Sequence, residues 1–201
     1  SGKSNISFKA NELDIKYKDS KEITGKLVSK VKDLEFEGYQ FEAADASLEL
    51  ILRELSGEYS PFFKVLDSKV HISYDESGTE KADATLKVLV GDDIEHTASD
   101  GDGPVDALNN ALRKALAMFF PELKDVRLTD YKVRVLNEQE GTGAKVRVLI
   151  ESAYEDDSWS TIGVSKNIIE ASRQALSDSF NYRLAKLSKW SIKNKKSLQL
   201  S

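Results

Sequence analysis

The chain has 201 residues with 34 Asp and Glu against 29 Lys and Arg, a net charge of −5, and no cysteine. This composition is typical of a globular protein, excludes a disulfide scaffold or a cysteine nucleophile, and has the wrong sign for binding nucleic acid through phosphate neutralisation. No apolar leader and no run of about 18 apolar residues occurs, so we expect a cytoplasmic protein without a membrane span. No P-loop, GxSxG or HExxH motif is present.

Helical patterns fill residues 1–60, which we expect to form a small helical linker subdomain. Apolar residues recur at helical spacing over residues 6–13, 22–36 and 43–55. Gly57 ends the third pattern. The chain starts at Ser1 without a methionine, which indicates a piece of a longer protein.

Residues 61–190 carry an internal repeat. The segment at 84–90 matches the one at 144–150, and when this offset is held constant the match continues into the following helical patterns, where Gly103 aligns with Gly163. Strand-like alternation followed by a helical stripe recurs in each copy, which predicts two βββα units. We expect an α+β domain in which the two units stack around a pseudo-twofold axis and which forms a homodimer.

The expected elements of this repeat can be placed along the chain. The copies cover about 62–120 and 124–185, and the Lys- and Ser-rich residues 191–201 are expected to form a flexible tail. The first copy is predicted to have strands at 69–74, 85–90 and 94–99 and a helix over 105–119. In the second, strands are expected at 126–137, 144–152 and 158–162, with a helix from Val164 to about Trp190.

The turn Gly101–Ala107 is the sharpest candidate for a binding site. Pro104 stands where the first helical residue belongs, and free N–H groups at a helix start can hold a carboxylate or a phosphate. The same turn could also be a plain strand-to-helix connection. The equivalent loop at 159–167 offers hydroxyl groups and Asn167, which favours a ligand site. The two histidines, His71 and His96, are more typical of packed or surface residues than of metal ligands.

Several segments together resemble a known family. Gly101–Ala107 with its following helix, 128–134 and 160–167 are similar to the C-terminal regulatory domain of the 2-isopropylmalate synthase family. The segments at 2–5 and 37–47 resemble the linker of its citramalate synthase branch. The resemblance covers nearly the whole chain and implies a TIM barrel that uses a divalent metal to condense acetyl-CoA with a 2-oxo acid, followed by this linker and a duplicated, dimerising βββα domain. It further implies that the domain binds the end-product amino acid, leucine in isopropylmalate synthases and isoleucine in many citramalate synthases.

Neither an HxH pair nor a DGxR-like start occurs in this sequence, so we expect the fragment to lack catalysis and a cofactor, the metal belonging to the barrel. As a hypothesis, backbone N–H groups at the Gly101 turn take the effector's carboxylate, polar side chains take its ammonium group, and apolar side chains enclose its aliphatic part. The expected effector-binding residues are Gly101, Gly103, Val105, Asp106, Ala107, Tyr131, Tyr154, Thr161, Ile162, Val164 and Asn167.

Other interpretations stay open at this point. A pocket of this kind separates leucine from isoleucine by only about 1–3 kcal/mol, so a leucine-sensing isopropylmalate synthase fragment or a homocitrate synthase fits as well. A dimerisation domain without an effector is a second alternative. A third is an independent enzyme that uses carboxylate chemistry at Asp102, Asp106 and His96.

Overall fold

The computed structural model describes residues 21–137 and 143–198, and the side chains of residues 24–188 within them. The helix expected over residues 6–13 lies outside the described residues. None of the described helices combines the length and the apolar character that crossing a membrane requires.

The chain divides into two compact units. The first-copy unit comprises residues 61–127 and 183–201, and the second-copy unit comprises residues 1–60 and 128–182. The described part of residues 1–60 therefore belongs to the same unit as the second βββα copy, whereas the sequence indicated a separate helical subdomain.

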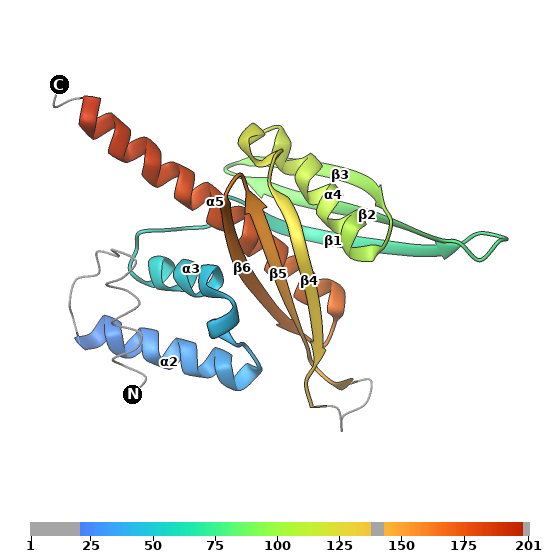
Figure 1. The fold of residues 1–201 in the computed structure, drawn as a ribbon, viewed down its shortest axis with the longest axis horizontal. Helices are drawn as coiled ribbons and strands as arrows, with labels where there is room; N and C mark the ends of the chain where they lie inside the picture. Colours follow the sequence, from blue (N-terminus) through green and yellow to red (C-terminus); the bar gives the residue numbers. More distant parts are fainter. Residues whose placement is uncertain (1–20, 138–142, 199–201) are drawn as a thin grey trace. The chain divides into compact units, whose positions relative to one another are not determined.

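Three antiparallel strands and a helix form the first-copy unit, namely β1 (Lys64–Tyr74), β2 (Glu80–Val90), β3 (Asp93–Gly101) and α4 (Pro104–Ala117), followed by the short η2 (Pro121–Leu123). The strand order is β1-β2-β3, with α4 on one face (Figure 1). Alternate residues of β2 are buried, as expected for a strand with one face against a helix. The Thr97 hydroxyl of β3 donates a hydrogen bond of 2.9 Å to the Ala111 carbonyl of α4, which fixes helix against strand.

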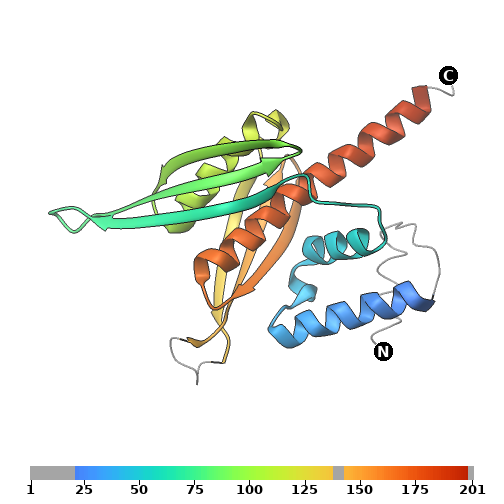
Figure 2. The same ribbon diagram turned by 180° about the vertical axis from the view of Figure 1, so that it is seen from behind.

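The second-copy unit repeats this order with β4 (Arg127–Val135), β5 (Val146–Tyr154), β6 (Asp157–Ser165) and α5 (Ile168–Leu198), whose residues up to Tyr182 belong to this unit. It also contains α2 (Lys21–Glu37), η1 (Phe41–Ala43) and α3 (Asp45–Leu55). The Thr161 hydroxyl of β6 donates to the Ala175 carbonyl of α5 at 2.8 Å, so α5 covers that face of the sheet. Figure 2 shows α2 and α3 lying side by side.

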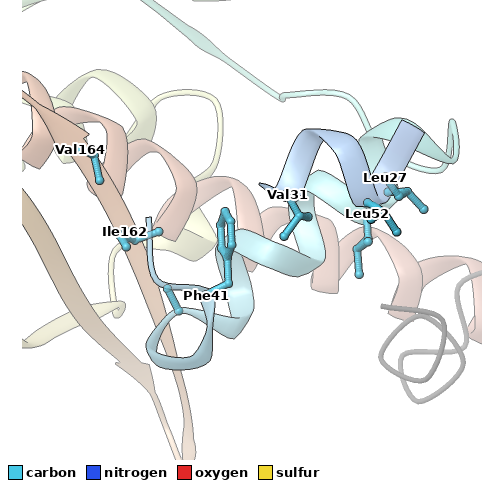
Figure 3. Packing of buried hydrophobic residues seen from close by; sticks show 8 residues of the cluster. Leu27, Val31, Phe41, Leu52, Ile162 and Val164 are labelled. Carbon is cyan, nitrogen blue, oxygen red and sulfur yellow. The ribbon is translucent and has the colours of Figure 1, made fainter. Parts of the chain in front are cut away.

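Apolar side chains join α2, η1 and α3 to the other face of this sheet. Phe41 and Leu52 are buried together with Ile162 and Val164 of β6 (Figure 3). Strand residues alternate between faces, so Thr161 faces α5 while its neighbours Ile162 and Val164 face α2, η1 and α3. The sheet of the second-copy unit thus has helices on both faces.

The two βββα copies confirm the predicted repeat, but the offset between equivalent positions is 64 rather than 60. The Thr97–Ala111 and Thr161–Ala175 hydrogen bonds are counterparts at this offset. The strand pairs agree, because Leu86 lies opposite Thr97 as Ile150 lies opposite Thr161. A shift of four residues is almost one helical turn and an even number of strand residues, so it keeps apolar positions on apolar positions in both elements. The match seen in the sequence therefore had the right pattern and the wrong register.

Two further expectations about the second copy were wrong. Residues of the expected loop at 159–167 are mostly strand, because β6 extends to Ser165. Consequently α5 starts at Ile168 instead of Val164, and it continues to Leu198 beyond the end expected at Trp190. Gly163 was taken as a loop residue, but in β6 it permits close packing: a Cβ atom there would lie 1.9 Å from the Ala171 carbonyl oxygen.

Candidate functional site

The start of α4 is an uncapped helix terminus built by the segment that the sequence singled out. Gly103 precedes the helix in extended conformation and Pro104 is its first residue, as predicted. The N–H of Ala107 donates to the Gly103 carbonyl at 2.9 Å, which closes the first turn. The N-cap residue, Gly103, makes no side-chain hydrogen bond that would cap this helix. The N–H groups of Val105 and Asp106 are therefore among the donors that a helix start leaves without an internal partner, at its positive end.

Gly101 is required by the fold for a reason other than ligand approach. A Cβ atom at this position would lie 2.2 Å from the backbone nitrogen of Ala107, so any side chain would collide with the first turn of α4. At Gly103 the nearest atom to a Cβ would be a Glu80 carboxylate oxygen at 4.0 Å. A Cβ atom would therefore fit at Gly103, whereas Gly101 allows the close packing of β3 and α4.

Asp106 gives this helix start a negative side chain. Its carboxylate accepts a hydrogen bond of 2.9 Å from the Asp102 N–H, which holds the turn before the helix. The Asn110 side chain donates to the Asp100 carbonyl at 3.1 Å and lies 3.5 Å from the Asp106 carboxylate. Asp106 remains exposed and can face a cationic group from solvent.

The sequence analysis missed one polar group on α4. Asn109 is buried, with 8% of its surface exposed, and its Oδ1 atom has no hydrogen-bond partner within the described residues. Buried polar atoms are nearly always paired, so an unpaired acceptor marks a place where a donor fits. The signal in the sequence was an asparagine directly after Leu108, on the apolar side of the predicted helix.

The start of α5 differs from the start of α4, because the Asn167 side chain caps it. The Asn167 Oδ1 atom accepts hydrogen bonds from the N–H groups of Ile169, at 2.8 Å, and Glu170, at 3.3 Å. A hydrogen bond from Arg173 lowers the pKa of the Glu170 carboxyl and outweighs the opposing effect of burial. The two helix starts are thus not equivalent as anion sites.

The remaining candidates of the second copy are hydrogen-bonded within their own unit or are partly or fully buried. Thr161 is fully buried with its hydroxyl bonded to α5, and Ile162 and Val164 belong to the apolar cluster with α2 and α3 (Figure 3). The Tyr131 and Ser172 hydroxyl groups are 3.0 Å apart. Tyr154 is half-buried at the end of β5.

The eleven candidate residues therefore separate into two groups. Five of them, Gly101, Gly103, Val105, Asp106 and Ala107, gather at the start of α4 in the first-copy unit. The other six belong to the second-copy unit. That these six line the same site as the first five stays a prediction.

Known proteins support the resemblance seen in the sequence. The LeuA allosteric (dimerisation) domain family matches residues 42–184, which include both βββα copies. This chain belongs to that family. The sequence is 48% identical to the (R)-citramalate synthase of Geobacter sulfurreducens and 47% identical to that of Aquifex aeolicus, in each case over 92% of this chain and 35% of the relative. The 2-isopropylmalate synthase of Shewanella woodyi is 31% identical over 63% of this chain and 22% of the relative.

The predicted family and the predicted α+β fold are thus confirmed, with the citramalate synthases as the more similar branch. The chain spans about a third of the length of these citramalate synthases. The family match begins within η1 of this chain, and α2 precedes it.

Proposed function

We propose that this chain is the effector-binding regulatory part of a citramalate synthase and that isoleucine is its effector. The observation that carries the proposal is the uncapped start of α4 at Gly103. The equivalent start of α5 is capped by Asn167. The chain belongs to an allosteric domain family. The full protein would condense acetyl-CoA with pyruvate in the cytoplasm, in a barrel that holds the divalent metal. The chain itself would have no catalytic activity and would form a homodimer.

The proposed binding uses four groups of α4. The N–H groups of Val105 and Asp106 donate to the effector's carboxylate, which also gains from the positive end of the helix. The Asp106 carboxylate faces its ammonium group, and the unpaired Asn109 Oδ1 atom offers a further acceptor. The Val105 side chain is half-buried and contacts the aliphatic part, whose burial contributes roughly 1.5–3 kcal/mol.

Leucine is the second candidate effector, because more distant 2-isopropylmalate synthases also match this chain. The higher identity to citramalate synthases favours isoleucine. A dimerisation domain without any effector is the alternative of a different class.

Thermal unfolding of the chain with millimolar isoleucine, leucine, valine or citramalate tests the proposal. Isoleucine, as the proposed effector, is expected to raise Tm most. A ligand at 100 times its Kd stabilises the folded state by about 2.7 kcal/mol. Asp106→Asn should weaken the effect because it removes the charge opposite the ammonium group, whereas Asp102→Asn, an exposed neighbour, should not. A Tm unchanged by all four compounds would favour the effector-free dimerisation domain.

A further inference from the structure

Exposed apolar side chains gather on the first strand of each βββα copy. Ten large apolar side chains are exposed among the described residues, and five of them lie in β1 or β4. No residue of either strand is buried, in contrast to β2 and β5. We define the first-strand strips as Ile72 and Tyr74 of β1 and Val133 and Val135 of β4, which are 43%, 66%, 41% and 47% exposed.

These four residues lie on the face of each sheet that the helix covers. Ile72 pairs with Ala82, a buried residue on the α4 side of β2. Tyr131 reaches Ser172 of α5, and Val133 and Val135 share its face by alternation. Among the described residues, the outer parts of the first strands stay largely exposed on this face.

The opposite edge of each sheet is closed by side chains of the same unit. In β3 the carbonyl of Ala98 accepts a hydrogen bond from Lys114, and that of Asp100 accepts one from Asn110, both at 3.1 Å. In β6 the N–H of Ile162 donates to Ser47 at 3.1 Å. The Val164 N–H of the same edge donates to Gln174 at 3.1 Å. Such capping disfavours pairing of β3 or β6 with another chain.

We propose that the first-strand strips are the surface through which two copies of this chain associate. The inference rests on the proposed homodimer and names its contact surface. A second copy fits as the partner because the family is described as a dimerisation domain and because each βββα copy carries such a strip. The other face of these strands carries Lys69, His71, Lys132 and Arg134, whose burial in an interface would cost desolvation.

The test is sedimentation velocity of the chain over a range of concentrations. The double variant Ile72→Lys/Val133→Lys should weaken the dimer at least tenfold, because it places charge in an apolar contact. The control His71→Lys/Asp130→Asn changes the net charge by the same amount on the other face and should leave the dimer intact. Circular dichroism and thermal unfolding establish that each variant is folded, and the milder pair Ile72→Thr/Val133→Thr should give a smaller loss.

A measurement without substitution completes the test. Hydroxyl-radical labelling of Tyr74 in the unaltered chain should fall as the protein concentration rises through the dimer range. If the unaltered chain dimerises and the lysine variant is equally dimeric, the proposed contact surface is wrong. The same holds if the unaltered chain dimerises and the labelling of Tyr74 stays constant. Neither result would contradict the homodimer itself. A chain that stays monomeric at every concentration would overturn the proposed homodimer, and with it this inference.

Discussion

The Ser47 hydroxyl of α3 donates a hydrogen bond of 2.7 Å to the Asp178 carboxylate of α5. The same Ser47 oxygen accepts a hydrogen bond from the Ile162 N–H of β6. One side chain thus joins the helices that precede the repeat to both the helix and the sheet of the second copy. Burial raises the pKa of Asp178 to about 7, the Ser47 hydrogen bond opposes this, and the charge of Glu54 adds to it.

Stability is therefore expected to fall as pH rises from about 4 to about 7. The pKa of Asp178 is higher in the folded chain than the value of about 3.9 for an unfolded Asp, so the stabilising effect of its proton is complete below pH 4 and is lost as pH rises towards 7. Asp178→Asn should remove this loss, on the order of 4 kcal/mol, and keep an acceptor for Ser47. Urea denaturation at pH 4 to 8 measures it. Asp156→Asn, in an exposed turn, is the control, and parallel pH profiles for Asp178→Asn and the unaltered chain would contradict the prediction.

Gly163→Ala should destabilise the second-copy unit strongly. The added Cβ atom would lie 1.9 Å from the Ala171 carbonyl oxygen, so β6 and α5 must separate, at a cost of about 3 kcal/mol or more. The matched control is Gly25→Ala in α2, where a Cβ atom meets nothing within 4 Å and helix propensity favours Ala. Thermal unfolding compares the two, and equal Tm values would argue against the close packing at Gly163.

Gln174→Leu should cost more stability than Tyr39→Phe. The Gln174 Oε1 atom accepts hydrogen bonds from the Val164 N–H and from the Tyr39 hydroxyl, each at 3.1 Å. Leu removes both hydrogen bonds of the Gln174 Oε1 atom, which costs about 1–3 kcal/mol, whereas Phe removes only one hydrogen bond, worth about 0.5–1.5 kcal/mol. Urea denaturation gives both values, and hydrogen exchange at the Val164 amide should quicken in Gln174→Leu alone. The reverse order of stabilities would show that Tyr39 is the dominant partner.

Asn167→Ala should lower stability by about 1 kcal/mol, because it removes the cap from the Ile169 and Glu170 N–H groups. Asn167→Asp keeps the capping oxygen and is expected to retain most of that stability. Chemical denaturation of the three proteins checks it. If Asn167→Ala unfolds at the same urea concentration as the unaltered chain, the capping role is wrong.

Much of the fold could be predicted because local patterns identify elements that pack one face inward. The helix expected over 22–36 is α2 (Lys21–Glu37), with Leu27 and Val31 buried as its stripe predicted. Strand ends were harder to place. β1 starts at Lys64, earlier than expected, because a half-exposed edge strand with a bulge near Leu66 shows no clear alternation. The segment Gly101–Ala107 leads into the start of α4 as predicted, since a Gly-Pro helix start is a local signal.

The sequence by itself determined the βββα repeat, the start of α4 and the family, because periodicity and short motifs depend on neighbouring residues. Only the tertiary structure decided the register of that repeat, since a shift of four residues preserves both the helical and the strand pattern. The contacts of Thr97 with Ala111 and of Thr161 with Ala175 fix that register. Thr161 was expected in a ligand-binding loop, but the tertiary structure places it in β6, where it is buried. Tertiary packing also brought Ser47 to Asp178 across 131 positions of the chain, a distance over which local patterns carry no information.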